Sequence, residues 1–175
     1  GCTATGGGSE MVSSGGRLPR RGATVSTGEL RETIRADLRA NRGYPKSALV
    51  LVGFRAAQWA RSLPGPQGRL VHLVVGGLYK LCSEWVLGIE LPASTPVGPG
   101  LRLRHGVGTV INPHARLGAN VLLRHNVTVG NRRTETDCPV IEDDVEIGAG
   151  AVLIGDITVG RGARIGAGAV VSVDV

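Results

Sequence analysis

The sequence predicts a mainly β protein, a β-solenoid preceded by a small α-helical domain. Two observations carry this prediction. An aliphatic residue recurs every six positions through the second half of the chain, whereas apolar residues in the first half follow helical spacing. Composition agrees, because 28 of the 175 residues are glycine while aromatic residues make up only 3%. A core of small aliphatic side chains with few rings is typical of thin, repetitive packing.

The first half of the chain divides into a tail and a helical domain. Residues 1–25 are rich in Gly, Ser, Thr and Arg and are predicted to form a flexible basic tail. The sequence STGE at 26–29 predicts a capping box at the start of a helix that ends near Gly43. Two more helices are expected on either side of a turn in LPGPQG, at 63–68. Residues 26–88 are therefore predicted to form the helical domain.

The six-residue repeat fills the second half of the chain and continues past two interruptions. The segment at 131–140 interrupts the repeat without loss of frame, because Val129 and Ile141 are twelve residues apart, and two extra residues lie between Leu103 and Ile111. Such a repeat predicts short parallel strands stacked coil on coil, with the aliphatic side chains inward. We assign residues 89–175 to this solenoid. The repeat positions are Leu91, Val97, Leu103, Ile111, Leu117, Leu123, Val129, Ile141, Ile147, Leu153, Val159, Ile165 and Val171.

Charge and cysteine content narrow the classes of function. A net charge of +6 fits an anionic partner, but the few aromatic residues argue against nucleic acid, because single-strand binders stack bases on rings. Three scattered cysteines give neither a disulfide framework nor a metal-binding pair, so we expect a cytoplasmic protein without a metal. The apolar region at 70–91 is broken by His72, Lys80 and Glu84, which argues against a membrane span and leaves peripheral association with a membrane open.

Three segments make a family resemblance visible: GIELPASTPVGPGLRLRHGVGTVIN at 88–112, VLLRHNVTVGN at 121–131 and VIEDDVEIGAGAVLIGDITVGRGARIGAGAVV at 140–171. With them the chain resembles the hexapeptide-repeat acyltransferases. It is most similar to their serine acetyltransferase branch, including its short relatives of exopolysaccharide and colanic-acid synthesis. The resemblance implies a left-handed parallel β-helix, a homotrimer, and acetyl-CoA bound as co-substrate in the groove between subunits.

The resemblance also implies catalytic roles for His105 and Glu90. His105 stands where the family has its catalytic histidine, and Glu90 stands where the family has an acidic partner. A neutral imidazole is suited to removing the proton of an alcohol as it attacks a thioester. A carboxylate on the other ring nitrogen would fix the tautomer. Asn126 is a candidate for stabilising the oxyanion, and His125 beside it is a candidate for the same cleft.

For CoA, the family uses backbone groups of small residues and basic side chains that meet the phosphates. Small residues let the pantetheine arm approach the backbone, and the arginine fork suits phosphate. The alternative is that the turns of the repeat require small residues and that the arginine is a solvent-exposed residue at a corner of the coil. The matching positions here are Gly130, Ala149, Gly150, Arg164 and Ala167.

The acceptor side departs from the serine acetyltransferases. Where those enzymes have an aspartate before the catalytic histidine, this chain has Arg104, and their Asp-Pro is missing from RGYP at 42–45. Those enzymes have an Arg-His pair in a projecting loop, and this chain has Asp137 and Cys138 at the same positions. An arginine repels a cationic amine, so a carboxylate, a phosphate or sugar hydroxyls suit this pocket better. We expect Arg104, Asn126, Asp137 and Cys138 to border the acceptor.

Three functions are compatible with these residues. The first is an acetyl-CoA-dependent O-acetyltransferase that acts on a small molecule or a sugar, with His105 as general base. The second is authentic serine acetylation in cysteine biosynthesis, through a rearranged pocket. The third is a non-catalytic trimeric scaffold, which the presence of His105 together with Glu90 disfavours.

Overall fold

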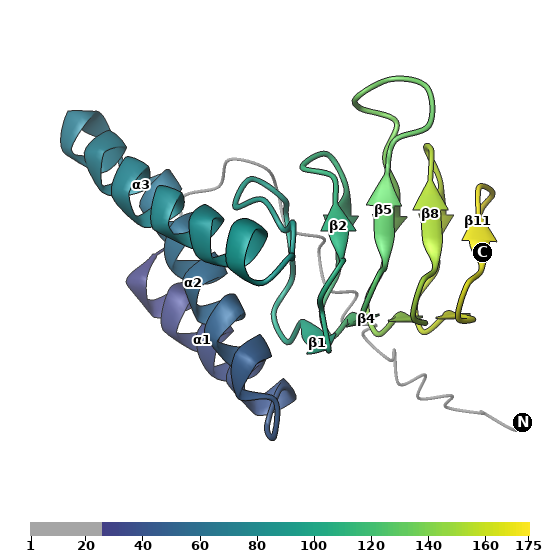
Figure 1. Cartoon of the computed structure of the whole chain (residues 1–175). Coiled ribbons are helices and arrows are strands. Elements are labelled where there is room, and N and C mark those ends of the chain that lie inside the picture. Colours follow the sequence, from purple (N-terminus) through teal and green to yellow (C-terminus); the bar gives the residue numbers. More distant parts are fainter. Residues whose placement is uncertain (1–25) are drawn as a thin grey trace, which may run out of the picture.

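The computed structural model describes residues 26–175, so the tail predicted for residues 1–25 lies outside the described part. Figure 1 shows a group of helices at one end of the molecule and a stack of coils at the other. The helices are α1 (Thr27–Ala40), α2 (Pro45–Ser62), α3 (Gly65–Lys80) and the π-helical segment η1 (Leu81–Val86). Over residues 26–175, no helix combines the length and the apolar character needed to cross a membrane.

The helix boundaries follow local signals. The predicted capping box is confirmed, because Ser26 Oγ accepts from Glu29 N at 3.2 Å and Glu29 Oε2 accepts from Ser26 N at 2.8 Å. The turn predicted at 63–68 is partly wrong, since α3 already begins at Gly65. Pro66 lies in the first helical turn, where the N–H that proline lacks would have no partner within the helix.

The second half folds into short parallel strands arranged in three sheets. Their orders are β1-β4-β7-β10, β2-β5-β8-β11 and β3-β6-β9. The strands are β1 (Arg102–Arg104), β2 (Val110–Ile111), β3 (Arg116–Leu117), β4 (Leu122–Arg124), β5 (Thr128–Gly130), β6 (Val140–Ile141), β7 (Glu146–Ile147), β8 (Val152–Ile154), β9 (Thr158–Val159), β10 (Arg164–Ile165) and β11 (Val170–Val171).

The strand register reproduces the sequence repeat. Ile111 pairs with Val129, eighteen residues further on, so one coil contains three six-residue repeats. Leu103 pairs with Leu123, twenty residues further on, because the two extra residues lie in that coil. The predicted parallel β-solenoid behind a small helical domain is therefore confirmed, and its left hand stays a prediction.

The core runs through the inside of the coils and into the helical domain. Repeat aliphatics such as Leu117, Ile141 and Val159 are fully buried, one above another in the same sheet. Leu51 and Phe54 of α2 extend this apolar cluster between the helices. The first coils thus have a helical cap on one side, which removes their apolar surface from water.

A buried ion pair joins the helices to the first coil. Arg55 Nε of α2 donates to Asp37 Oδ2 of α1 at 2.8 Å, and the two side chains are only 4% and 2% exposed. Arg55 also donates to the backbone carbonyls of residues 97–98 at 2.8 and 2.6 Å. Asp37 Oδ1 accepts from the backbone N–H groups of residues 100–101 at 2.7 and 3.1 Å. We call this arrangement the Asp37–Arg55 joint.

Asn41, at the C-terminal end of α1, extends the joint up to β1. Its Nδ2 donates to Leu101 O at 2.7 Å, and its Oδ1 accepts from Leu103 N at 3.0 Å. Asn41 is buried, and an unsatisfied amide there would be costly. These contacts therefore fix the position of β1 relative to the helices.

Candidate active site

His105 occupies a corner of the solenoid directly after β1. Its backbone has a φ of 59°, in the left-handed region that residues other than glycine seldom adopt. Gly108, with a φ of 73°, lies three residues further on, and a Cβ added there would collide with Asn126 Oδ1. The two extra residues of this coil thus form a bulge that leaves the side chain of His105 exposed.

His105 and His125 lie at the same corner of neighbouring coils, because β1 and β4 pair in register up to the residues that precede them. With Val107 and Asn126 they line an open depression of about 430 Å³. The backbone of Asn126 has a φ of 55°, and its N–H donates to Val107 O at 2.9 Å. The structure therefore brings the predicted His105 and Asn126 together, with His125 beside them.

The same corner continues along the solenoid as a row of small residues. The pairing of β4, β7 and β10 places the residues after these strands in line. Gly150 N donates to His125 O at 3.0 Å, and Gly168 N donates to Ala149 O at 2.8 Å. We call this row the histidine edge. It contains His105, His125, Asn126, Ala149, Gly150, Ala167 and Gly168.

Arg104 is held against the helical domain. Its guanidinium lies 4.0 Å from the centre of the Tyr44 ring, an attractive cation–π geometry. It also donates to Ala40 O at 3.1 Å and to Asn41 Oδ1 at 3.2 Å. The Tyr44 ring also contacts His105. The two rings lie edge to face, with their centroids 5.8 Å apart.

Glu90 lies on the coil before His105, alongside β2. Its N–H donates to Thr109 O at 2.8 Å, and its carbonyl accepts from Ile111 N at 2.8 Å. Among the hydrogen bonds and ion pairs of residues 26–175, none joins Glu90 to His105. The pairing of these two side chains stays a prediction.

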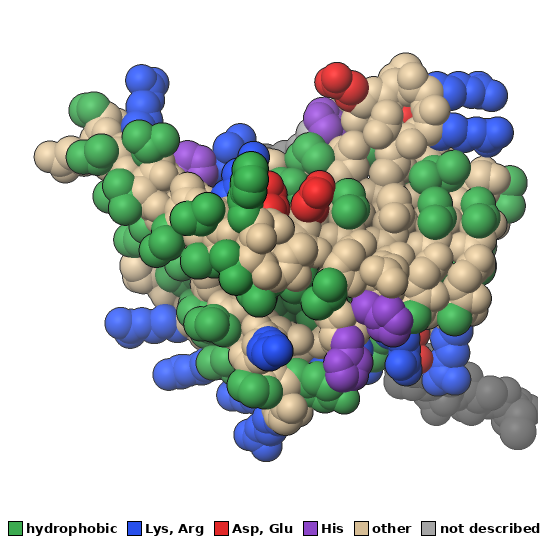
Figure 2. All heavy atoms as spheres, viewed as in Figure 1, with side chains coloured by type: hydrophobic (Ala, Val, Ile, Leu, Met, Phe, Trp, Pro, Cys, Tyr) green, Lys and Arg blue, Asp and Glu red, His purple; other side chains and the backbone are tan. Residues whose placement is uncertain are grey.

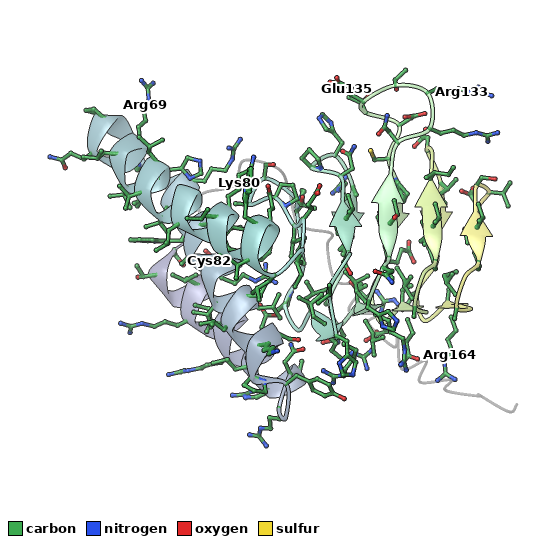
Figure 3. The ribbon with its side chains drawn as sticks, in the orientation of Figure 1. Arg69, Lys80, Cys82, Arg133, Glu135 and Arg164 are labelled. Carbon is green, nitrogen blue, oxygen red and sulfur yellow. The ribbon has the colours of Figure 1, made fainter. Side chains whose placement is uncertain are left out.

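Gly130 and Arg164 lie apart from the histidine edge. Gly130 ends β5 at the opposite end of that strand from Asn126, and its carbonyl accepts from Gly155 N at 3.2 Å. The side chain of Arg164 is 81% exposed, with Glu146 Oε2 3.8 Å from its Nε. Figure 3 shows that it projects away from the coils. Neither residue touches the depression at His105.

The inserted segment forms a loop that projects beyond β5 (Figure 1), and Asp137 holds it together. The carboxylate accepts from the backbone N–H groups of residues 132–134 at 2.7 to 3.1 Å. Partial burial raises the pKa of Asp137, but these N–H groups outweigh it and hold the pKa below its ordinary value. Cys138 is buried next to it, with Sγ 3.6 Å from Glu135 O. An acceptor role for either residue stays a prediction.

Replacing Asp137 with asparagine should loosen the loop. The variant loses charge-assisted hydrogen bonds, so amide exchange at residues 132–134 should accelerate about tenfold. In the wild type, protection should be complete above the ordinary aspartate pKa of about 3.9 and should fall as the pH drops through the lowered pKa. Hydrogen exchange corrected for intrinsic rates measures both. Glu135→Gln, an exposed change in the same loop, is the control, and equal protection in both variants would contradict this role of Asp137.

Two features of the site were missed by sequence reasoning. The sequence does not reveal that Tyr44 contacts His105, although Tyr44-Pro45 stands where the family has an Asp-Pro and that place was the available signal. The alignment of His125 with Ala149 and Ala167 could have been found by adding the coil length and the insertion to the position of each corner. Both features depend on which segments the fold brings together rather than on residue type.

Comparison with known proteins identifies the repeat. Residues 138–172 match the family model for the bacterial transferase hexapeptide (six repeats). The chain is 34% identical over 139 residues to an Escherichia coli K12 protein named as a colanic acid biosynthesis acetyltransferase, WcaB, with 77% of this chain and 85% of WcaB covered. It is 35% identical over 138 residues to the serine acetyltransferase of Bacillus licheniformis, with 78% of this chain and 63% of that protein covered.

Solved structures of serine acetyltransferases share the fold. The Brucella abortus S19 enzyme superposes with a TM-score of 0.72 at 26% identity, over 85% of this chain and 64% of that one. The soybean enzyme complexed with serine gives 0.67 at 32% identity, over 83% and 63%. The chain thus spans less than two thirds of these enzymes. The coils and the matched repeats together define a transferase built on hexapeptide repeats. The chain belongs to the hexapeptide-repeat acetyltransferases and is an enzyme of the serine acetyltransferase and WcaB type.

Proposed function

We propose that this acetyltransferase moves an acetyl group from acetyl-CoA to a hydroxyl group of a small molecule or a sugar, with His105 as general base. One observation carries the proposal. The bulge after β1 holds His105 in a left-handed backbone conformation, exposed, at the head of an edge of small residues. Backbone conformations of this kind are costly and cluster at functional sites.

The proposed reaction needs no nucleophile from the protein. The acceptor oxygen forms a bond to the thioester carbonyl carbon while the imidazole of His105 takes the hydroxyl proton. The carbon–sulfur bond then breaks, and the imidazolium returns the proton to the sulfur of CoA. Asn126, in the same depression, is the proposed donor to the oxyanion. Glu90 is the proposed partner that orients the imidazole, on the strength of the resemblance.

The histidine edge is the proposed track for the pantetheine arm, because Ala149, Gly150 and Ala167 leave room for it beside exposed backbone. Replacing Ala167 with leucine should raise the KM for acetyl-CoA about tenfold and leave kcat nearly unchanged, since the leucine crowds the track and not the reacting atoms. Steady-state kinetics with varied acetyl-CoA measures this. Thr158→Leu makes a similar change at an exposed position of β9. A rise in KM of the same size in both variants would contradict the assignment.

The acceptor is proposed to be a neutral or anionic hydroxyl compound. The Tyr44 ring lies beside His105 and the Arg104 guanidinium stacks on that ring, where the serine acetyltransferases are expected to have carboxylates. A cation at this place disfavours the ammonium group of an amino acid. Arg104 retains N–H donors beyond the two that are bonded to Ala40 and Asn41.

Serine acetylation is the second candidate, because of the 35% identity to the Bacillus licheniformis enzyme. Release of free thiol from acetyl-CoA, measured with serine, a neutral sugar and a sugar acid as acceptors, separates the candidates. We expect kcat/KM for a sugar to exceed that for serine. A higher value for serine would establish the second candidate. Binding of acetyl-CoA without turnover of any acceptor would favour a scaffold.

Two further expectations complete the proposal. The groove that holds acetyl-CoA is expected to be completed by a neighbouring subunit of a homotrimer, which would bring a second chain's Gly130 and Arg164 to the histidine edge. Light scattering of the purified protein measures the mass of the assembly. The cytoplasmic location expected from the cysteine content also stays a prediction.

A further inference from the structure

One side of the helical domain is an exposed apolar surface. Apolar residues recur there every three or four positions along α3 and η1, so they share one face of the helix. Leu73 is 72% exposed and Trp85 is 80% exposed. Figure 2 shows hydrophobic side chains gathered over α3. We call this surface the α3 face. It consists of Leu70, Leu73, Val74, Leu78, Leu81 and Trp85.

Packing on the opposite side of α3 fixes this face outward. Tyr79 is buried there, and its hydroxyl donates to Leu91 O of the first coil at 2.7 Å. Its ring lies 6.0 Å from that of Phe54 in α2. Turning α3 to hide its leucines would expose Tyr79 and break that hydrogen bond. The apolar face is therefore a stable feature of the fold.

Basic residues outnumber acidic ones around the α3 face, where Glu84 lies next to Trp85. No Asp or Glu occurs between Asp37 and Glu84, a stretch that contains seven Lys and Arg residues. Arg55 is used in the joint described above, and the other six are exposed. Arg69 and Lys80 project from the same side of α3 (Figure 3), although Lys80 also lies 3.7 Å from Glu84. Of the six, Arg69 and Lys80 lie on α3 and Arg61 lies in the last turn of α2, whereas Arg39, Arg42 and Lys46 lie where α1 ends and α2 begins.

We propose that the α3 face docks the protein on an anionic lipid surface. Leucines and a tryptophan on one face of a helix, with basic residues around it, have the chemistry of interfacial helices, whose apolar side enters the headgroup region. Tryptophan favours this region in particular. The basic residues complement anionic headgroups. A second copy of the chain is a poorer partner, because Arg69 and Lys80 of the two copies would face each other with little negative charge beyond Glu84 to offset them.

Vesicle binding by the full chain tests the proposal. Sedimentation with phosphatidylcholine vesicles that contain roughly one third phosphatidylglycerol should deplete the protein, and pure phosphatidylcholine should not. Added NaCl should weaken the binding, because salt screens the headgroup attraction. In a Trp59→Phe background, the emission of Trp85 should shift to shorter wavelength on binding. The double variant Leu73→Gln/Trp85→Gln should bind the anionic vesicles about tenfold more weakly or worse.

The control is Val173→Gln, which changes a residue that is also exposed (69%) but lies at the far end of the solenoid. It should bind like the wild type. All variants should keep the wild-type thermal transition, because the changed side chains are largely in solvent. Absence of vesicle binding, or equal binding by the double variant, would overturn the proposal. Self-association that depends on concentration and is lost in the double variant would assign the face to a second copy instead.

Discussion

Acetyl transfer by the His105→Asn variant should fall at least about a hundredfold, the usual effect of removing a general base. Asparagine is chosen because it tolerates the left-handed backbone that His105 adopts, with a φ of 59°. The variant therefore removes the imidazole without distorting the bulge. The measurement is free-thiol release from acetyl-CoA under saturating acceptor, compared with a thermal melt of the same preparation.

His125→Asn is the matched control, because His125 borders the same depression one coil away. It should retain activity within about tenfold of the wild type, since a group that only lines the site moves no proton in the proposed reaction. If His125→Asn abolished turnover while His105→Asn did not, the base would be His125. Wild-type rates in both variants would remove the imidazoles from the mechanism.

Replacing Asp37 with alanine should destabilise the protein by about 3 to 5 kcal/mol, the range for removing one member of a buried ion pair. The change leaves the Arg55 guanidinium buried without its carboxylate, and it leaves the N–H groups of residues 100–101 without an acceptor. That loss is a large part of the stability of a small protein. Urea unfolding followed by circular dichroism measures it.

The control for this variant is Glu84→Ala, which removes the partly exposed ion pair with Lys80. Its effect should stay below about 1 kcal/mol, as for surface pairs in general. The double variant Asp37→Ala/Arg55→Ala should be less destabilised than the sum of the two single variants, because the second change removes the unpaired charge. Simple additivity would show that the two side chains do not act as a pair.

The joint also has a consequence for the site. Through Asn41 it holds β1 from Leu101 to Leu103, and Arg104 lies against Tyr44 directly before His105. A variant that folds but has lost the joint should therefore be slower in catalysis, since small displacements of a positioned base are costly. Activity measured well below the melting temperature separates this effect from unfolding.

Much of the fold could be predicted because each coil repeats the same requirement. Every sixth side chain must be aliphatic to fill the inside of the coil, and the positions from Leu91 to Val171 satisfy it across the insertion. The bulge at His105 could also be predicted, because the two extra residues between Leu103 and Ile111 interrupt the six-residue repeat at that point. The start of α3 was misplaced because a proline in a first helical turn has the same sequence signal as a turn.

The sequence by itself determined the solenoid and the helical domain, because both depend on residue type and spacing along the chain, and its resemblance to the acyltransferases indicated the candidate base. Only the tertiary structure decided that Asp37 and Arg55 hold the first coil, that Arg104 stacks on Tyr44 beside His105, and that Asp137 accepts hydrogen bonds within its own loop. The physical reason is that these roles belong to pairs of groups far apart in the chain. The role of a polar side chain depends on the partner that folding places within hydrogen-bonding distance. That partner cannot be identified from the composition or from the six-residue repeat.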